Sequence, residues 1–298
     1  MTRRNFICGA GASFAATAFG VGGEKDVLDR WQAETDLVRP ESYLGYLRDG
    51  DTRAFASLEK LDAGFQKVMD EVKACRVTGI PAVWHVYNMG FVVKTPNALF
   101  SIDLNHRRDE ELAPLLDFAL ITHNHNDHYR NPFYKAMDKA GKTVISNFKD
   151  NYGAADWRKG GKYWEAGGYT RAEKKFKLKD VEIRTALTDH NPYLVDFTTT
   201  FEIRVGKWRL FHTGDCGNAA KLSTVWGKPD LWLVFPGCGI DIAAAYRKIK
   251  PKRMVFGHLW ELGHETGRLT TPMVKAARER VEALGGKVDV PLWGERVV

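Results

Sequence analysis

One short cluster of metal-binding side chains constrains the fold of this chain more than any other feature. His123, His125, Asp127 and His128 lie within six positions, directly after the apolar residues 116–121. Alternate side chains of an extended segment point the same way, so His123 and His125 can bind one metal ion together. Asp127 and His128 come after the chain turns and can face a second ion. The fold must therefore bring further ligands to the end of this strand.

Three distant residues are candidates for the missing ligands. His190, Asp215 and His258 each follow an apolar or alternating run that predicts a strand. The ends of strands are where open α/β sheets place their ligands. His264 lies six residues beyond His258, in the following loop. We prefer His258 as the ligand, and leave His264 as either a substrate or proton-transfer group or an ordinary loop histidine.

The order of these residues resembles that of a known family. The pattern HxHxDH, then a His, an Asp and a Gly-His, is similar to that of the metallo-β-lactamase superfamily, over residues 81–298. The resemblance implies an α/β fold, a four-layer αββα sandwich of two mostly antiparallel or mixed sheets. Within the superfamily, the spacing is most similar to the ascorbate-phosphate lactonase and related small-hydrolase branch.

The resemblance also implies a role for each ligand. The first metal ion takes His123, His125 and His190, and Asp215 bridges the two ions. The second ion takes Asp127, His128 and His258. Asp103, at the end of the run 99–103, has the position of an aspartate that supports the site from behind.

These ligand types indicate hydrolytic chemistry. Imidazole and carboxylate ligands suit two divalent cations, with zinc expected and manganese or iron as alternatives. Two such ions lower the pKa of a shared water from ~15.7 toward ~7, which gives a hydroxide nucleophile at neutral pH. We expect this nucleophile to attack an ester, lactone, phosphodiester or amide of a small molecule. Asp127, Asp215 and His264 are the predicted catalytic residues.

The charge balance bears on the substrate. The chain has 44 Lys and Arg against 37 Asp and Glu, a formal net charge of +7. This mild excess favours a small anionic substrate and is weak evidence for nucleic acid. Two rival functions stay open: a nuclease or phosphodiesterase acting on nucleic acid, and a noncatalytic metal-binding protein with the same fold.

The N-terminus predicts export. Arg3 and Arg4 precede an uncharged stretch rich in small residues, which resembles a twin-arginine signal peptide over residues 1–23. Ala18 ends a small-x-small motif where the signal can be cleaved. We expect a bacterial periplasmic or secreted protein, with no stable membrane insertion after signal removal, because the apolar stretch barely reaches ~18 residues.

The rest of the chain divides into two parts. Residues 24–78 predict a helical extension with an apolar stripe at helical spacing, and residues 79–298 the catalytic domain. In the latter, residues 110–116 predict a helix and residues 149–169 a wall of the pocket. His85 and His212 lie within strand-like runs and are expected to be ordinary core or surface histidines, and Cys216 to pack in the core.

Overall fold

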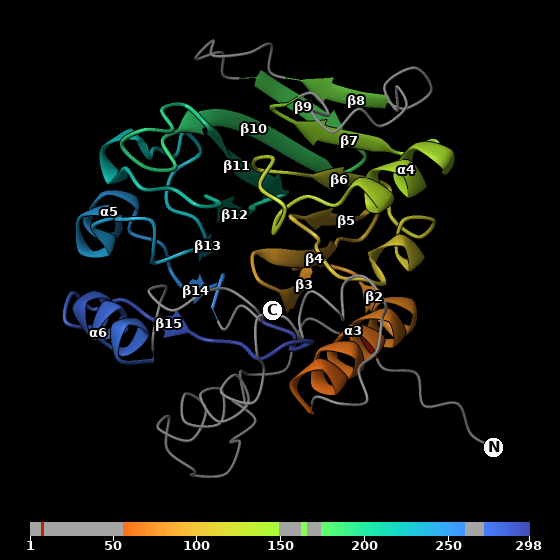
Figure 1. The fold of residues 1–298 in the computed structure, drawn as a ribbon, viewed down its shortest axis with the longest axis horizontal. Coiled ribbons are helices and arrows are strands. Elements are labelled where there is room, and N and C mark those ends of the chain that lie inside the picture. The colour runs from red at the N-terminus through yellow and green to blue at the C-terminus, as the bar shows by residue number, and fades with distance from the viewer. Residues whose placement is uncertain (1–6, 9–55, 149–161, 166–173, 260–270) are drawn as a thin grey trace.

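Two mixed β-sheets lie face to face between two layers of helices (Figure 1). The computed structural model describes residues 7–8, 56–148, 162–165, 174–259 and 271–298. Within these residues the predicted four-layer αββα sandwich is confirmed. His264, Arg3, Arg4 and most of the segment expected to form a pocket wall lie outside the described residues.

The first sheet is built from the earlier half of the described chain. Its six described strands have the order β3-β4-β5-β6-β7-β8. β3, β4 and β5 pair antiparallel, and β5 to β8 pair parallel. The strands are β3 (Ala82–Tyr87), β4 (Gly90–Lys94), β5 (Leu99–Ile102), β6 (Phe118–Leu120), β7 (Thr143–Ser146) and β8 (Lys162–Glu165).

The second sheet contains seven strands among the described residues, in the order β15-β14-β13-β12-β11-β10-β9. β9 to β12 form an antiparallel meander, and β12 to β15 are parallel. The strands are β9 (Lys174–Leu178), β10 (Val181–Thr188), β11 (Thr198–Val205), β12 (Trp208–His212), β13 (Leu231–Val234), β14 (Met254–Phe256) and β15 (Val288–Asp289).

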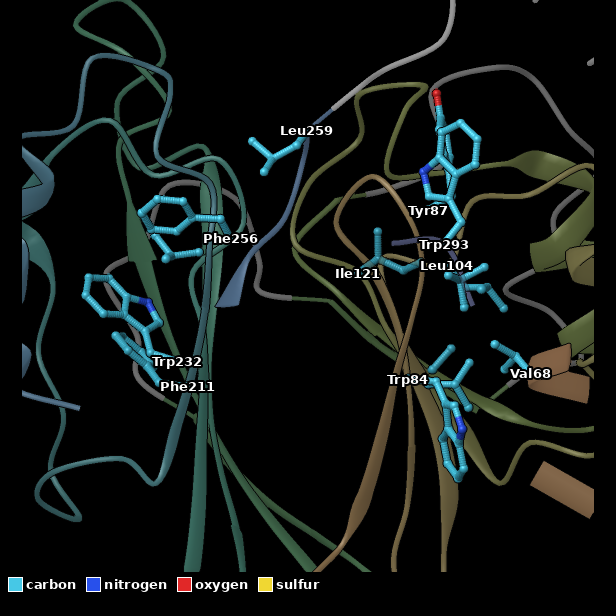
Figure 2. Packing of buried hydrophobic residues seen from close by; sticks show 14 of the residues in the cluster. Val68, Trp84, Tyr87, Leu104, Ile121, Phe211, Trp232, Phe256, Leu259 and Trp293 are labelled. Carbon is cyan, nitrogen blue, oxygen red and sulfur yellow. The ribbon is translucent and has the colours of Figure 1, made fainter. Parts of the chain in front are cut away.

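Apolar side chains alternate between the two faces of each sheet. Val83 and Phe91 point into the layer between the sheets, where they meet residues such as Ile203. Alternate residues of the strands point outward: Trp84 of β3 and Trp232 of β13 lie on the two outer faces (Figure 2). This period of two is what lets one strand bury both of its faces.

Helices cover the outward faces. α3 (Ala56–Ala74) packs on β3 in the first sheet, with its apolar stripe in the same core cluster as Trp84. Gly64 has no room for a side chain, because a Cβ there would lie 2.8 Å from the carbonyl oxygen of Trp293. The other described helices are α4 (Asn131–Lys139), α5 (Ile242–Ile249) and α6 (Thr271–Glu282).

The predicted helix at residues 110–116 is wrong. The chain forms only a 3₁₀ turn at Asp109–Glu111 and then irregular turns. Pro114 explains the difference, because proline lacks the N–H of a helical hydrogen bond and disfavours helical backbone in the residue before it.

Near the N-terminus, Ile7–Cys8 forms a two-residue strand (β1) that pairs in parallel with β2 (Arg76–Val77).

Candidate metal centre

The predicted ligands meet where strands of both sheets end. His123 follows β6, while His190, Asp215 and His258 follow β10, β12 and β14 of the other sheet. A backbone hydrogen bond from Thr199 to Thr122, 2.8 Å long, links the two sheets beside this point. The sandwich therefore gathers into one site residues that are as much as 135 positions apart, from His123 to His258.

Three histidines form the first group of ligand atoms. His123, His125 and His190 each offer a ring nitrogen, and these atoms lie within 4.8 Å of one another. The Nε2 atom of His123 is 3.1 Å from Nδ1 of His125. His123 is fully buried, whereas the other two are partly exposed. The group is therefore open to solvent on the side of His125 and His190.

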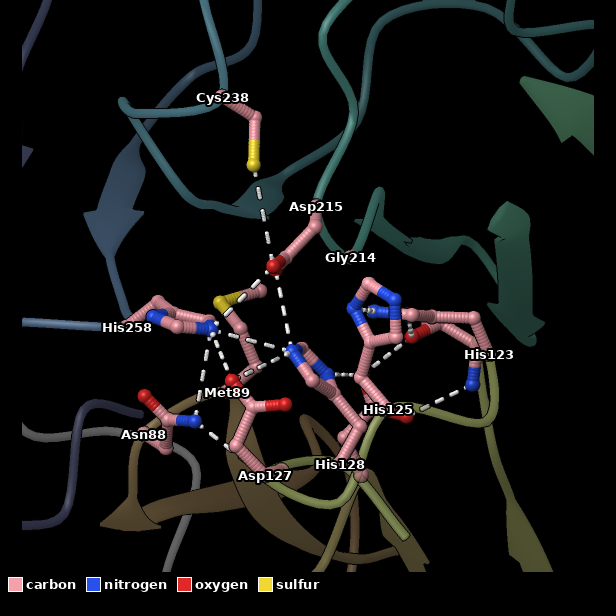
Figure 3. Close-up of polar contacts among 12 residues, drawn as sticks. Asn88, Met89, His123, His125, Asp127, His128, Gly214, Asp215, Cys238 and His258 are labelled. Atoms are coloured by element: carbon pink, nitrogen blue, oxygen red, sulfur yellow. Dashed lines mark hydrogen bonds and ion pairs between the residues drawn. The ribbon is translucent and has the colours of Figure 1, made fainter. Parts of the chain in front are cut away.

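The second group contains both carboxylates. Asp127, His128, Asp215 and His258 also offer ligand atoms within 4.8 Å of one another (Figure 3). The Nε2 atom of His258 is 3.0 Å from Oδ2 of Asp127 and 3.1 Å from Nε2 of His128. Lone pairs of neutral ring nitrogens repel at this distance unless a proton or a cation lies between them, so the arrangement suits a cation.

Asp215 touches both groups. Its Oδ1 lies 3.2 Å from Nε2 of His128, and its Oδ2 lies 3.5 Å from Nε2 of His190 and 3.3 Å from Nε2 of His258. The side chain is 4% exposed, and apart from the ion-pair contact with His128 its Oδ1 makes no hydrogen bond with the described residues. A buried carboxylate oxygen in this state is costly unless a cation binds it. The donor set thus fits two metal ions that share Asp215.

Asp103 fixes the protonation pattern of ligands in both groups. Its Oδ2 accepts hydrogen bonds from Nδ1 of His128 (2.9 Å) and from the hydroxyl of Thr122 (2.7 Å). Since the Thr122 hydroxyl donates to Asp103, it accepts from Nδ1 of His123 at 2.9 Å. In the neutral rings of His123 and His128, both Nε2 atoms therefore carry the lone pair that a metal ion needs.

The carboxylates around His128 stabilise positive charge at this position. Burial alone would lower the pKa of His128, but Asp215, Asp127 and Asp103 together raise this pKa well above its usual range. Burial likewise opposes ionisation of Asp215, yet His258 and His128 hold the pKa of its carboxyl well below normal. The pocket stabilises positive charge among its carboxylates. At His123, burial outweighs the nearby carboxylates, so the pKa is lowered and the ring stays neutral.

Three residues that have no ligand pattern in the sequence border the centre. Asn88, in the turn between β3 and β4, donates to the carbonyl of Asp127 at 3.1 Å, and its own carbonyl accepts from the backbone of His258 at 2.9 Å. Phe197 lies against the rings of the three-histidine group. Phe235 stacks on His258 with ring centroids 4.2 Å apart. The Asn-Met-Gly sequence at residues 88–90 is typical of a tight turn, but no local pattern links that turn to the ligands.

Two histidines and one cysteine of the described residues, His85, His212 and Cys216, lie outside the ligand groups. His85 and His212 are buried, and both contact backbone carbonyls of the hairpin turn, namely those of Asn88 and Met89. Cys216 is next to Asp215 in the chain but contacts the hydroxyl of Thr188 at 3.2 Å. These three residues are core groups, as their strand positions indicated.

Comparison with solved structures identifies the fold. YhfI of Bacillus subtilis, a metallo-β-lactamase fold protein, aligns with a TM-score of 0.57 and 12% identity over 74% of this chain and 100% of its own. Igni18, a metallo hydrolase of Ignicoccus hospitalis, gives 0.53 and 19% over 73% and 98%. CmlA, a diiron β-hydroxylase of Streptomyces venezuelae, gives 0.56 and 12% over 74% of this chain and 54% of its own.

At these identities the similarity shows the fold alone: the chain has the metallo-β-lactamase fold. No protein-family profile matches the sequence, and no curated protein matches it. Among the described residues, none of the helices is both long and apolar enough to span a bilayer.

Proposed function

We propose that this protein is a metal-dependent hydrolase with two divalent cations in the pocket described above. The observation that carries the proposal is Asp215, which contacts His190 of the three-histidine group as well as His128 and His258 of the other group. A carboxylate shared in this way is the usual bridge between paired metal ions in hydrolytic sites. YhfI and Igni18 share the fold, and Igni18 is described as a metallo hydrolase.

Different side chains have different roles in such a site. When bound, two divalent cations supply an acidified water and polarise the bond under attack. Asp103 and Thr122 orient the ligand rings of both groups. Asp127 is the carboxylate that water and substrate can reach, because its side chain is 13% exposed against 4% for Asp215. Phe197 shields the rings of the three-histidine group on one side.

We propose a small anionic ester, lactone, phosphodiester or amide as substrate, in line with the net charge of +7. The spacing of the motif supports the branch of small-molecule hydrolases that includes ascorbate-phosphate lactonases. We also propose that the twin-arginine start exports the protein. Replacing Arg3 and Arg4 by Lys should leave the precursor in the cytoplasm in a fractionation assay, and normal processing of that variant would refute export.

Metal analysis of the purified full chain tests the main proposal. We expect close to two equivalents of metal per chain, and hydrolysis of members of a lactone, phosphodiester and ester panel after loading with zinc, manganese or iron. Asp215→Ala should lower hydrolysis by more than the roughly 10- to 100-fold typical of changes behind the ligands. Asp180→Asn is the matched control, because Asp180 binds Thr95 in the turn between β4 and β5.

The results of these experiments distinguish the proposed dinuclear hydrolase from the alternative functions. Well under two metal equivalents, with no change in Asp127→Ala, would refute a dinuclear site. Full hydrolysis by Asp215→Ala would refute the bridging role. A metal-loaded protein that hydrolyses none of the small molecules, but binds RNA or DNA with an affinity that falls steeply with salt, would favour the nuclease reading instead.

A further inference from the structure

A third group of ligand atoms lies on the partly exposed side of the centre and includes a cysteine. His190, Asp215 and Cys238 offer atoms within 4.8 Å of one another. The Sγ atom of Cys238 is 3.8 Å from Oδ2 of Asp215 and 3.9 and 4.0 Å from the two ring nitrogens of His190. Figure 3 shows the Cys238 side chain pointing at Asp215 from the loop that follows β13.

These separations are close to those of atoms that share one metal ion. A zinc–sulfur bond of ~2.3 Å and a zinc–nitrogen bond of ~2.0 Å place the two ligand atoms roughly 3.5 Å apart in a tetrahedral site. Cys238 thus needs to move only a few tenths of an ångström. Asp215 independently fits a metal ligand, since its buried Oδ1 makes no hydrogen bond with the described residues, while Oδ2 is the oxygen that Cys238 faces.

The loop that carries Cys238 is closely fitted to the ligand strands. A Cβ on Gly217 would lie 2.3 Å from the carbonyl oxygen of His190 and 2.6 Å from that of Cys238, so the three backbones pack directly together. Gly237 fits against the ring of Phe235, which in turn stacks on His258. The backbone that carries Cys238 is therefore packed against the segments that carry His190 and His258.

The backbone at this position would accept glycine more easily than cysteine. Cys238 has φ 54°, in the left-handed region that side chains other than those of Asn and Asp rarely adopt. Its neighbours in the sequence are both glycines. Cys216 offers a contrast within the same chain: it adjoins Asp215, but its sulfur contacts Thr188 and the carbonyl of Asn218.

We propose that Cys238 is a metal ligand of this centre, whose thiolate binds the ion held by His190 and Asp215. The inference rests on the proposed metal-dependent function and deepens it by naming a sulfur ligand. Binding of the ion releases the thiol proton to solvent. Because thiolate is a soft ligand, the centre should prefer zinc or cadmium to manganese. The sequence-based expectation of a ligand set without sulfur would then need revision.

Cobalt spectroscopy on the metal-stripped full chain tests the sulfur ligand directly. Added Co²⁺ should produce the near-ultraviolet charge-transfer band of a thiolate–cobalt bond together with the visible bands of bound Co²⁺. Cys238→Ser and Cys238→Gly should lose the charge-transfer band and keep the visible bands. Cys75→Ser is the matched control and should keep both, because Cys75 follows α3 and its sulfur lies 4.0 Å from the Arg296 guanidinium.

Cys238→Gly tests whether the charge-transfer band is lost because the sulfur ligand is missing or because the fold is disturbed. Glycine tolerates positive φ, so with metal removed from both chains Cys238→Gly should unfold at the same or a higher temperature than the natural chain. In Cys238→Ser, affinity for Cd²⁺ should fall by roughly tenfold or more, while affinity for Mn²⁺ changes by less than about threefold.

The possible results are distinct. A charge-transfer band that survives in both Cys238 variants, or that never forms although equilibrium dialysis shows bound Co²⁺, overturns the sulfur ligand and leaves the metal-dependent hydrolase standing. Failure of the natural chain to bind Co²⁺ or Zn²⁺ at all contradicts the proposed function, and the role of Cys238 falls with it.

Discussion

Single residues set the chemistry of this pocket through protons as well as through ligand atoms. Asp103 determines which nitrogen of His128 carries a proton and, through the Thr122 hydroxyl, which nitrogen of His123 does. One buried carboxylate thus prepares a ligand in each of the two groups. Its backbone has φ 46°, a conformation that Asn and Asp adopt more readily than other residues with a side chain.

Asp103→Asn should therefore weaken metal binding without a change in backbone conformation. All three contacts of the Asp103 carboxylate are with donors, so in either orientation the amide nitrogen of Asn would face at least one donor and could not accept from it: the Thr122 N–H, or His128 Nδ1 and the Thr122 hydroxyl. We expect metal affinity to fall by roughly 10- to 100-fold, as is typical when a partner behind a metal ligand is lost. Competition with a chromophoric chelator measures this change.

Two further variants show whether the loss of metal affinity comes from the hydrogen bonds that Asp103 accepts. Thr122→Val removes the link to His123 but leaves the contact of Asp103 with His128, so its effect should be smaller and confined to one of two binding steps. Asp180→Asn, in the turn between β9 and β10, should bind metal like the natural chain. Equal affinities in Asp103→Asn and Asp180→Asn would show that Asp103 does not prepare the ligands.

At the scale of elements, the loop between β10 and β11 positions His190. Lys221, in the 3₁₀ turn Ala219–Lys221, binds Asp189 at the start of this loop and Asp196 near its end. Burial would raise the pKa of Asp189, but Lys221 and Asn218 together hold it below its usual value. A lowered pKa means that the ion pair stabilises the fold above about pH 4 and is lost on further acidification.

Lys221→Met should loosen this loop at neutral pH. Tyr193 within the loop is 93% exposed and offers a cleavage site for chymotrypsin. Loss of a partly exposed ion pair lowers the free energy of opening the loop by on the order of 1 kcal/mol. We therefore expect cleavage after Tyr193 to become roughly threefold to tenfold faster. Lys179→Met, which removes the ion pair with Asp117, is the control. Identical cleavage rates in the two variants would show that Lys221 does not restrain the loop.

Elements also show which sequence signals were reliable. β3 is an apolar run that is buried on both faces, and the buried residues of α4 (Phe133, Tyr134 and Met137) recur at helical spacing on one face. The helix predicted at residues 110–116 does not form, since Pro114 overrides a favourable composition. Local pattern therefore predicts an element well where burial and backbone chemistry agree.

For the whole molecule, the metal centre joins the two sheets. His123 comes from the first sheet and Asp215 from the second, so an ion bound by both links the halves of the sandwich. Ligands that bind only the folded state stabilise it by about 4 kcal/mol at a thousandfold excess over Kd. Removal of metal should thus lower the stability of the entire fold.

We expect the unfolding temperature to fall by roughly 8–16 °C for each tightly bound ion when a chelator removes Zn²⁺, at ~2–4 °C per kcal/mol for a domain of this size. Differential scanning calorimetry with and without Zn²⁺ measures the shift. Asp215→Asn should show a much smaller difference between the two conditions. An unchanged unfolding temperature in the natural chain would mean that metal does not link the sheets.

The sequence by itself determined the kinds of ligand and their places at strand ends, because alternation and strand termination are local properties of the chain. It could not determine that the Asn88 turn touches His258, that Phe197 covers the three-histidine group, or that Cys238 faces Asp215. Those contacts join segments far apart in the sequence, and only the packing of the two sheets brings them together. The cluster at residues 123–128 required distant partners, and the tertiary structure decided which residues stand close enough to act with it.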